Sequence, residues 1–385
     1  MSRPTVAEID LDALRFNLRQ LKKLTRGRAE VLAVVKANAY GHGAPEVARE
    51  LESAGARIFG VATTEEGIQL RLSGTAVPIL VLAGTYPDEF DRIAANRLTP
   101  VIYDLEIARA FNARAEKERR RLSVHLKIDT GMNRLGIPWR QWEAALEVLR
   151  SLKKLRVEGL MSHFSVAEGK GAEDRAFTRE QLSRFTRCLD LAGRKGIQPR
   201  YVHLANSAAT TLLEPARFNL VRSGLMMYGY HPSPALHDLV SLRPILRWKT
   251  AVLSLKKVPK GDPVSYGRTF RCPRESLIAV LPVGYADGYS RHLSNRGEVL
   301  IRGRRAKIAG IVCMDLTMVD VSEVPGVKAG DEVVLLGRQE AEEINAVEMA
   351  GWIEAIPYEV LCAIGKRVPR VYRRSQGQDR GHNKG

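Results

Sequence analysis

The sequence has no long hydrophobic stretch. Its longest apolar runs, such as Val31–Val35 and Leu277–Val283, are far shorter than the roughly 18 residues that a membrane-spanning helix needs. The first residues, Met-Ser-Arg-Pro-Thr, do not lead into the apolar segment with small residues after it that marks an export signal. We therefore expect no membrane partner and a cytoplasmic protein.

Cysteine is scarce as well. The 385 residues include four cysteines, Cys188, Cys272, Cys313 and Cys362, and none of them forms a C-x-x-C pair. This spacing favours neither a disulfide framework nor a zinc site. We expect reduced, mostly buried thiols and no metal.

Acidic residues are fewer than basic ones. There are 43 Asp and Glu against 60 Lys and Arg, so the net charge is +17. Such an excess is one mark of a nucleic-acid binder. However, basic and acidic residues alternate, as in Arg114-Ala-Glu-Lys-Glu-Arg119, and no zinc finger, basic zipper or ribonucleoprotein motif occurs. We favour a solvated surface that attracts anions in general, and we predict no nucleic-acid partner.

The first 240 residues alternate short apolar runs with amphipathic helical patterns. The apolar runs are Val31–Lys36, Ile58–Ala62, Pro78–Ala83, Thr99–Ile102, Leu122–Ile128, Val157–Ser162, Arg200–Leu204 and Asn219–Arg222. Helical patterns follow at Pro45–Ala54, Trp139–Leu152 and Asp174–Lys195, and a helix start is expected at Thr63–Glu66. Eight such units match a closed parallel barrel, and the Gly-rich turn of an open Rossmann sheet is missing after the first run. The sequence predicts an α/β fold with a (β/α)8 TIM-type barrel in residues 1–240.

From about Leu242 the pattern changes to long alternating runs. They are Ile245–Val258, Leu277–Val283, Val299–Val312, Thr317–Val321 and Glu332–Leu336, with one helical stretch at Ala341–Ile353. We expect a mostly β C-terminal domain at 241–372 and a disordered basic tail at 373–385. The first ten residues are candidates for pairing with the β domain.

Unusual polar residues fall where the barrel strands end. Lys36 ends the first run, Lys127 and Asp129 end the fifth, and His163 follows the sixth. Ser207, Arg222 and Gly224 follow the seventh and eighth runs, where barrels commonly bind phosphate. Because barrel enzymes place their chemistry at the carboxyl ends of the strands, these residues predict an active site there.

Lys36 has two interpretations from its position alone. Desolvation after an apolar run lowers the pKa of an amine and makes it nucleophilic toward carbonyls. A lysine that reaches from a strand end into solvent is equally plausible. Lys127 beside Asp129 also suits a structural ion pair, and His163 suits a core histidine. Their common location favours catalysis.

The motif Ala33-Val-Val-Lys36-Ala-Asn-Ala-Tyr40-Gly-His-Gly43 resembles the attachment signature for pyridoxal 5′-phosphate (PLP) in alanine racemases. Similar motifs follow in the family's order, among them His125–Gly136, Met161–Phe164, His203–Ser207, Val221–Gly229, Ser265–Gly267, Gly284–Gly288, Cys313–Asp315 and Pro357–Glu359. The resemblance covers roughly residues 5–372. It implies a PLP-dependent homodimer that interconverts L-alanine and D-alanine and supplies D-alanine for peptidoglycan.

The resemblance also implies roles for single residues. Lys36 would hold PLP and act as one acid/base, and Tyr266 would act on the opposite face of the substrate, across the dimer interface. The implied contacts are Tyr40, Ser207, Gly224 and Tyr358 to the phosphate, Arg222 to the pyridine nitrogen, and His163 as a neighbour that tunes Tyr266. A guanidinium at that nitrogen donates hydrogen bonds and disfavours a protonated ring, which weakens the electron sink and suppresses transamination.

On the substrate side, the resemblance implies that Arg134 and the Met314 backbone hold the carboxylate. Lys127 matches a lysine that is often carbamylated in the family, and Tyr285 and Asp315 match residues of the substrate entryway. Two positions depart from the common pattern: Ile311 stands where many relatives have arginine, and Leu316 where glutamine is usual. The departures concern the entryway and leave the catalytic residues intact.

Several alternatives remain at this stage. A racemase of serine or of larger or basic amino acids would share the core motifs, although two tyrosines and Met314 would crowd all but a small side chain. A decarboxylase of the related fold is disfavoured because Arg222, not a carboxylate, follows the eighth run. A single-barrel PLP-binding carrier would lack the second domain. Salt-dependent DNA binding would favour a basic nucleic-acid binder.

Overall fold

The computed structural model describes residues 3–374, and its contacts divide the chain into two units. One unit is Leu14–Arg243. The other unit combines Met1–Ala13 with Pro244–Gly385, so the chain enters and leaves through the same unit. The single N-terminal strand, β1 (Val6–Asp10), explains this division because its ladder partners are both C-terminal strands.

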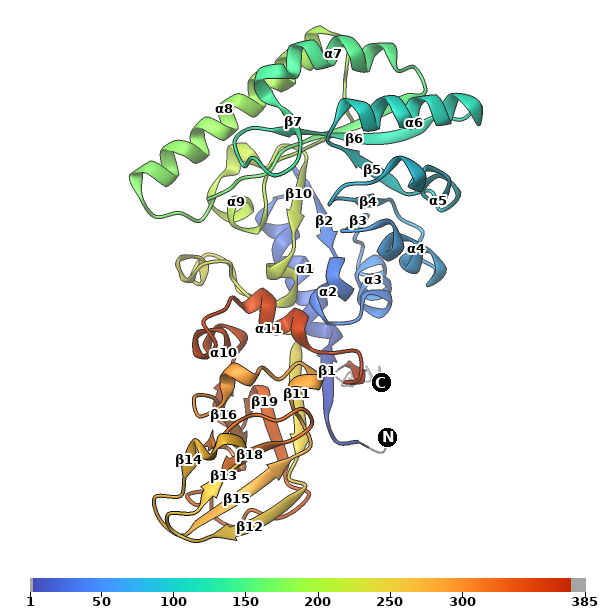
Figure 1. Ribbon diagram of the computed structural model, residues 1–385. Coiled ribbons are helices and arrows are strands. Elements are labelled where there is room, and N and C mark those ends of the chain that lie inside the picture. The colour runs from blue at the N-terminus through green and yellow to red at the C-terminus, as the bar shows by residue number, and fades with distance from the viewer. Residues whose placement is uncertain (1–2, 375–385) are drawn as a thin grey trace, which may run out of the picture. The chain divides into compact units, whose positions relative to one another are not determined.

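The unit Leu14–Arg243 is built on eight parallel strands (Figure 1). In chain order they are β2 (Glu30–Val34), β3 (Ile58–Val61), β4 (Ile79–Val81), β5 (Thr99–Ile102), β6 (Leu122–Asp129), β8 (Leu155–Met161), β9 (Tyr201–His203) and β10 (Leu220–Ser223). The sheet runs β10-β2-β3-β4-β5-β6-β8-β9, and the Arg222 amide donates to the Ala205 carbonyl at 3.0 Å to join its two ends. The predicted barrel is confirmed, and each of the eight apolar runs overlaps a strand.

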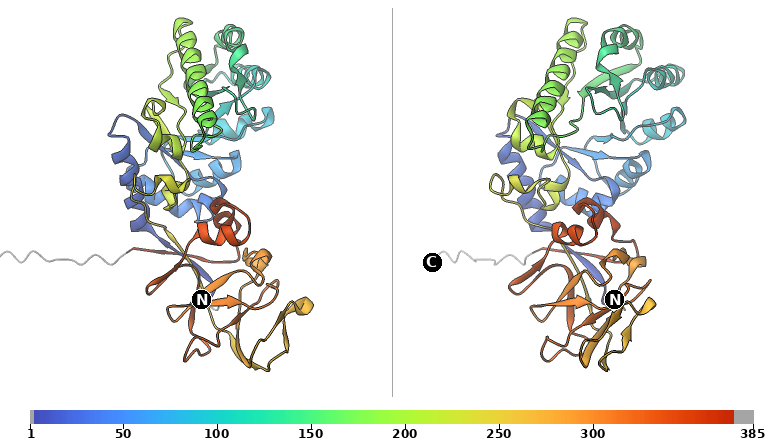
Figure 2. Two further views of the ribbon diagram at one scale, coloured as in Figure 1. Left: turned by 90° about the vertical axis from the view of Figure 1, so that its left-hand side faces the viewer. Right: turned by 60° about the vertical axis from the view of Figure 1, so that its left-hand side comes forward.

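Helices cover the outside of these strands. They are α1 (Leu11–Leu24), α3 (Ala44–Ser53), α4 (Thr64–Leu72), α5 (Phe90–Ala95), α6 (Leu105–Lys117), α7 (Trp142–Ser151), α8 (Ala172–Arg194) and α9 (Ser207–Leu212). Figure 2 shows the long helix α8, in green, along the outside of the barrel. Because strands under such a cover are buried on both faces, they appear in the sequence as continuous apolar runs.

Short elements connect these helices and strands. In the barrel they are the two-residue strand β7 (Ile137–Pro138) and the 3-10 turns η1 (Pro87–Glu89), η2 (Trp139–Gln141), η3 (Glu214–Ala216), η4 (Leu225–Tyr228) and η5 (Pro234–Leu236). In the other unit they are η6 (Tyr266–Arg268), η7 (Tyr285–Asp287) and η8 (Arg291–Leu293). Strand β7 pairs with β6 and was not predicted.

The second unit is mainly β, as predicted. Its ten-stranded sheet has the order β12 (Ser254–Val258), β15 (Ser276–Leu281), β18 (Thr317–Asp320), β17 (Arg304–Ile308), β16 (Glu298–Ile301), β19 (Glu332–Gln339), β11 (Leu246–Ala251), β1 and β21 (Arg370–Arg373), and β20 (Glu342–Ile344) pairs with β19. A small sheet joins β13 (Pro263–Val264) to β14 (Phe270–Arg271). Two helices lie near the C-terminus of this unit, α10 (Ala346–Trp352) and α11 (Pro357–Ala363).

Several boundaries in this unit differ from the sequence prediction. The runs 245–258 and 299–312 each hold two strands, and the second run turns at Arg302 and Gly303, both with positive φ. The helix predicted at 341–353 begins only at Ala346, because the Asn345 side chain accepts hydrogen bonds from two amides there and caps it. Of the tail predicted at 373–385, Arg373 ends β21, and residues 375–385 lie outside the described residues.

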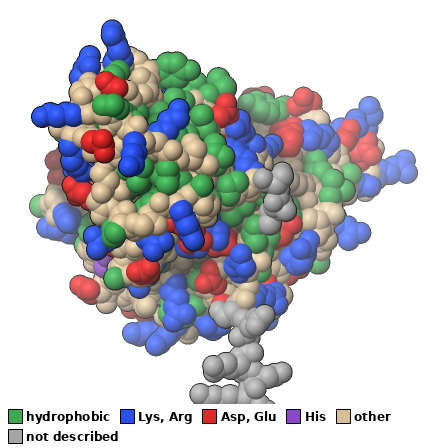
Figure 3. Space-filling model, turned by 90° about the horizontal axis from the view of Figure 1, so that it is seen from below, with side chains coloured by type: hydrophobic (Ala, Val, Ile, Leu, Met, Phe, Trp, Pro, Cys, Tyr) green, Lys and Arg blue, Asp and Glu red, His purple; other side chains and the backbone are tan. Residues whose placement is uncertain are grey.

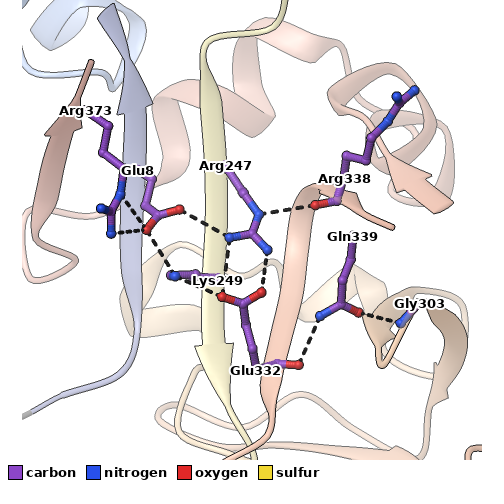
Figure 4. A network of polar contacts seen from close by, with 8 residues as sticks. All are labelled: Glu8, Arg247, Lys249, Gly303, Glu332, Arg338, Gln339 and Arg373. Atoms are coloured by element: carbon purple, nitrogen blue, oxygen red, sulfur yellow. Dashed lines mark hydrogen bonds and ion pairs between the residues drawn. The ribbon is translucent and has the colours of Figure 1, made fainter. Parts of the chain in front are cut away.

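Ion pairs join four strands of the β unit (Figure 4). The Glu8 carboxylate on β1 contacts Arg247 at 3.2 Å and Lys249 at 3.0 Å, both on β11, and Arg373 on β21 at 2.7 Å. Glu332 on β19 pairs with the same Arg247 and with Lys249, the latter at 2.9 Å. The network therefore fastens the N-terminal strand to the C-terminal sheet.

Charges of both signs share the protein surface. Lys and Arg side chains lie among Asp and Glu side chains over the face in Figure 3. Within residues 3–374, no helix combines the length and the apolar character needed to cross a bilayer.

Candidate active site

Lys36 begins a left-handed turn directly after β2. The segment Lys36–Tyr40 (α2) has φ between 51° and 54° at Ala37, Asn38, Ala39 and Tyr40. This conformation costs roughly 1–2 kcal/mol for each residue that has a side chain, so neighbouring groups must hold it. The turn presents the Lys36 side chain at the carboxyl end of β2, where it is exposed.

Two polar side chains hold this turn. Glu66 on α4 accepts hydrogen bonds from the Ala37 amide and the Ala62 amide, both at 2.7 Å. The Asn38 side chain accepts from the Ala44 amide at 2.9 Å, which ties the turn to the start of α3. The expected cap of α4 is present through Thr63, but Glu66 uses its carboxylate for the turn.

The Arg222 side chain on β10 makes five hydrogen-bond contacts. Its side chain is buried, and its two terminal nitrogens donate to the carbonyls of Ser162, His203 and Leu204 at 2.8–2.9 Å. They also contact Nδ1 of His203 at 3.1 Å and Nδ1 of His163 at 2.9 Å. Burial first, and then the nearby Arg134, lower the pKa of Arg222 to about 9.

A pair of buried histidines continues from Arg222 into the barrel interior. Because guanidinium only donates, Nδ1 of His203 is an acceptor and its proton sits on Nε2. That Nε2 contacts Nδ1 of His125 at 2.8 Å, which makes the His125 Nδ1 an acceptor too. Burial lowers the pKa of His125 to about 3 and the pKa of His203 well below its usual value, so both rings are neutral. This chain of neutral rings supports Arg222 without adding a negative charge.

Lys127, Arg134 and His163 lie in the same cationic surroundings. Burial, followed by Arg134 and Arg222, lowers the pKa of Lys127 to about 8. Burial and the charges of Arg222, Arg134, Lys127 and Lys36 lower the pKa of His163 well below its usual value. The predicted residues at the strand ends are therefore close enough to influence one another, and they form a site that favours anions.

Tyr40, Ser207 and Gly224 lie close together. A Cβ atom on Gly224 would lie 2.4 Å from the Tyr40 hydroxyl, so only glycine permits this approach. The Gly224 amide donates to the Ser207 hydroxyl at 3.2 Å. Asn206 caps α9 through the Ala209 amide and so fixes Ser207 at the helix start. Hydroxyl and amide donors in this arrangement suit a small oxyanion.

Tyr266, in the β unit, stands out from its surroundings with 69% of its surface exposed. It begins η6 between Ser265 and Gly267, which both have positive φ. The Ser265 hydroxyl donates to the Ile311 carbonyl at 2.7 Å and fastens this turn to the loop that follows β17. A large aromatic side chain is thus held in solvent by a well-anchored turn.

Met314 and Tyr285 are neighbours in the same unit. The Tyr285 amide donates to the Cys313 carbonyl and the Ala286 amide to the Met314 carbonyl, both at 3.0 Å. A Cβ on Gly284 would clash with these carbonyls, so glycine allows the two loops to meet. Met314 and Tyr285 are 53% and 42% exposed.

Asp315 and Tyr358 complete the predicted set. Arg367 contacts Asp315 at 2.6 Å and the buried Asp287 at 2.8 Å, so the Asp315 side chain is held in place. Tyr358 is half-buried near the start of α11.

Sequence reasoning did not identify five supporting residues. They are Glu66, His125, Gln181, His203 and Arg367. Gln181 on α8 donates to the His163 carbonyl at 3.1 Å and to the Thr130 hydroxyl at 3.3 Å. A buried glutamine in the middle of a long helix has no local sequence signal. The two histidines lie in recognisable motifs, but only their contact across strands shows what they do.

Comparison with known proteins gives one consistent family. The model of the alanine racemase N-terminal domain matches residues 9–232, and the model of the C-terminal domain matches residues 245–372. An alanine racemase of Geobacter sulfurreducens is 48% identical over 96% of this chain and 97% of its own length. One from Carboxydothermus hydrogenoformans is 47% identical over 96% of this chain and all of its own length.

Solved structures agree with this result. Alanine racemase from Clostridium difficile 630 has a TM-score of 0.92 and 37% identity, covering 97% of each chain. Alanine racemase from Bartonella henselae, described with covalently bound pyridoxal phosphate, has a TM-score of 0.84 and 29% identity, covering 96% of this chain and 99% of its own.

Proposed function

Because the chain belongs to the alanine racemase family, a family of PLP-dependent isomerases, we propose that Lys36 and Tyr266 move the α-proton of alanine on opposite faces of the substrate. Interconversion of L-alanine and D-alanine supplies the D-alanine of peptidoglycan. The observation that carries the assignment of Lys36 is its position: a held left-handed turn presents it at the carboxyl end of β2, close enough for its charge to contribute to the lowered pKa of Lys127 and of His163.

The residues of the barrel fit PLP. Lys36, Lys127, Arg134 and Arg222 form a cationic group that suits a ligand with a phosphate dianion, and Gly224 leaves room beside the Tyr40 hydroxyl. When bound, PLP supplies a conjugated ring that stabilises negative charge at the substrate α-carbon. We propose that the Tyr40 and Ser207 hydroxyls bind its phosphate together with Tyr358, and that Gly224 contributes a close approach of the backbone.

Arg222 has one N–H left for the cofactor. Within the described residues, the hydrogen bonds of its two terminal nitrogens involve all four of their N–H groups, so the Nε–H is the remaining donor. We propose that it donates to the pyridine nitrogen. Among the described residues, the partners of Arg222 are carbonyls and histidine rings, and none is a carboxylate that could share a proton with that nitrogen. A ring held in this way would be a weak electron sink.

The proton transfers use an amine and a phenol. Lys36 takes or returns the α-proton on its face, and the Tyr266 phenol does so on the other face. A phenol has a pKa near 10, which is high for a base at neutral pH, so Tyr266 needs a neighbour that favours its phenolate. We propose the side chains around His163 and Arg222 for this, because they are rich in positive charge.

The substrate carboxylate is assigned to Arg134 and the Met314 amide, with charge-assisted hydrogen bonds from the guanidinium. Lys127 would repel Arg134 as a cation. With its pKa lowered to about 8, a useful share of its amine is neutral near pH 7 and reacts with CO2. We propose that Lys127 is carbamylated, which turns a repelling cation into an anion that holds Arg134.

We further propose that the enzyme is a cytoplasmic homodimer with a shared active site. The exposed apolar groups of the β unit include Tyr266, Met314, Tyr285, Leu316 and Ile356. A second copy of the chain would cover them and receive Tyr266 into its barrel. Tyr285 and Asp315 would then line the substrate entry, with Ile311 and Leu316 making this entry less polar than the arginine and glutamine common in the family.

A complementation experiment tests the shared site. Lys36→Ala and Tyr266→Phe are purified separately and mixed under conditions that exchange subunits, and the circular dichroism of L-alanine is followed with added PLP. Each mixed dimer contains one intact site, so about a quarter of wild-type activity returns when the mixture equilibrates. Mixing that restores nothing, although mass spectrometry detects mixed dimers, rejects the shared site. Borohydride reduction and peptide mapping of the wild type must also find a pyridoxyl group on Lys36.

A further inference from the structure

A cavity lies at the opposite end of the barrel strands from Lys36. Its volume is about 560 Å³, within the range of small-molecule sites. Pro78, Thr99, Leu122 and Arg156 line it, and each stands at or beside the amino end of its strand, β4, β5, β6 or β8. Because the strands are parallel, a ligand bound here cannot compete with a ligand beside Lys36.

The cavity is strongly cationic. Its lining includes five arginines, Arg71, Arg97, Arg120, Arg121 and Arg156, and one carboxylate, Glu158. A recess with low-dielectric walls concentrates the field of such a group and attracts anions. Positive charge is therefore in local excess here, whereas charges of both signs are mixed on the face in Figure 3.

Two of these arginines are held in place by the protein. Arg71 donates to the carbonyls of Thr75, Val77, Asn96 and Arg97 at 2.7–3.0 Å, and burial lowers its pKa. Arg156 donates twice to the Ser123 hydroxyl, at 2.7 and 3.0 Å. Arg156 also pairs with Glu158 at 3.4 Å, so the one carboxylate of the lining offsets part of its charge. Both side chains are thus positioned by the protein.

The other three arginines are exposed and lack carboxylate partners. Among residues 3–374, no ion pair involves the side chain of Arg97, Arg120 or Arg121. Arg114 on α6 contrasts with them: it pairs with Asp91 at 2.7 Å and with Glu118 at 3.3 Å. The chain thus neutralises the arginine beside the cavity and leaves those on its rim unneutralised.

Arg97 occupies a position that favours glycine. It follows α5 with φ of 50°, the left-handed conformation in which helices usually place glycine or asparagine. A residue with a side chain costs about 1 kcal/mol more than glycine there. A guanidinium is therefore placed at the cavity against the local backbone preference.

One side of the cavity is apolar. Pro78, Phe90, Ala94 and Leu98 contribute to the lining, and Phe90 on α5 packs edge-on against Phe111 on α6 at 5.6 Å between ring centroids. The apolar side of the cavity is thus part of the packed contact between α5 and α6. A ligand that fits both sides combines several negative charges with an apolar or planar part.

We propose that this cavity binds a small molecule with two or more linked phosphoryl groups, of the nucleoside di- or triphosphate class. Guanidinium groups bind phosphate oxygens through paired N–H donors, and several of them around one recess match a chain of phosphates better than a single carboxylate. The apolar side would take the base. A recess of this size favours a small molecule over duplex nucleic acid, which needs an extended surface.

Titration calorimetry of the PLP-loaded enzyme tests the proposal, with ADP and inorganic tripolyphosphate as probes at an ionic strength of about 0.15 M. The variant Arg97→Gln/Arg121→Gln should weaken binding of both probes about tenfold or more, through the loss of two charged contacts. The control Arg109→Gln/Arg119→Gln removes the same charge from nearby exposed residues that do not line the cavity, and should change binding less than about twofold. All variants should keep wild-type racemase activity, which shows that they fold.

The outcomes separate the sources of affinity. Equal affinity for the two probes assigns the site to phosphate chains alone, and tighter binding of ADP adds the apolar wall; either result supports the proposal. Absence of binding to the wild type overturns it. Equal weakening by the two double variants overturns it as well, because the surface charge would then act without a site. Tighter binding of a mixed-sequence oligonucleotide, with equal losses in both variants, assigns the charge to nucleic acid instead.

Discussion

Arg222 in the barrel and Arg305 in the β unit are the same residue type in opposite surroundings. The partners of Arg222 are neutral rings and carbonyls, and burial lowers its pKa to about 9. Arg305 pairs with three carboxylates, those of Glu348, Glu342 and Glu298, and the hydrogen bonds that it donates to the first two raise its pKa most. One guanidinium is left with its charge uncompensated, and the other is fully compensated.

The contrast extends to both units. In the β unit, carboxylates neutralise the cations of Figure 4 within the protein itself. At the strand ends around Lys36, burial first and then the charges of neighbouring cations such as Arg134 and Arg222 lower the pKa of Lys127 and of His163. A structure that leaves cations unbalanced is stabilised by the anions it binds. This end of the barrel therefore suits an anionic ligand, whereas the network of the β unit stabilises the fold.

Lys36→Ala, in the barrel, should have the largest effect on activity. The loss of both the attachment point and one acid/base should reduce kcat/KM about 10⁴-fold in both directions of racemisation. Chiral chromatography of the products of L-alanine and D-alanine measures this. Retention of more than a few per cent of activity contradicts the role of Lys36, provided that far-UV circular dichroism shows a folded variant.

Arg222→Glu replaces the uncompensated cation with an anion. A carboxylate can share a proton with the pyridine nitrogen and strengthen the electron sink, so a larger share of turnovers should end in transamination, and racemisation should fall about 100-fold. Pyruvate formed per racemisation is the measure. Arg305→Gln is the matched control and should leave this ratio unchanged; an unchanged ratio in Arg222→Glu counts against the proposed role.

Replacing Lys127 should have a smaller effect on activity, and the modification of this lysine should depend on pH. Its pKa of about 8 means that the amine is mostly protonated below that pH and becomes able to react with CO2 as the pH rises through it. Labelled bicarbonate should give a carbamate signal in NMR spectra of the wild type that grows over this range and is absent in Lys127→Ala. That variant should raise KM for alanine about tenfold through a loosened Arg134. A wild type without the signal at pH 9 or so excludes the modification.

Glu8→Gln tests the ion-pair network of the β unit and should leave kcat unchanged. Burial pulls the pKa of Glu8 upward, but hydrogen bonds from Lys249, Arg373 and Arg247 outweigh it and lower the pKa. The variant should lose about 1–3 kcal/mol of unfolding free energy at neutral pH, because the cations lose their shared partner. Urea denaturation measures this.

The same network predicts acid sensitivity. The pKa of Glu332 falls from 4.5 to about 2, through hydrogen bonds from Arg247 and Lys249 that overcome the opposing effect of burial. A lowered pKa stabilises the fold above pH 4.5, and this contribution disappears as the pH falls toward 2. Wild type and Glu332→Gln should therefore converge in stability over that range. A constant difference between them would contradict the ion-pair account.

Much of the barrel could be predicted from sequence because it depends on local patterns. Strands buried on both faces leave uninterrupted apolar runs such as Ile58–Val61, and barrel geometry sends the residue after each run to one end. Lys36 and Arg222 could be placed at that end in this way, although position alone left two interpretations of Lys36. The family motifs added the residues of the β unit, for which position alone gave no functional signal.

Other features depend on contacts between distant segments. The run Ile245–Val258 holds two strands although it contains neither Gly nor Pro, so only the pairing of β11 with β19 and of β12 with β15 separates them. The left-handed conformation at Ala37–Tyr40 contradicts the local preference of each of its residues, and it is held by Glu66 from another helix. The exposure of Tyr266 likewise arises from the anchoring of Ser265 to Ile311, 46 residues away.

The turn after Lys36 means that this protein does not have the most stable sequence for its fold. Glycine at Ala37 or Ala39 would adopt the same backbone without the penalty of a side chain. It would also free the chain to sample other conformations and blur the position of the amine. Alanines at these positions lower the stability of the fold but fix the direction of the Lys36 side chain more sharply. The two hydrogen bonds that Glu66 accepts, from the Ala37 and Ala62 amides, offset part of this loss of stability.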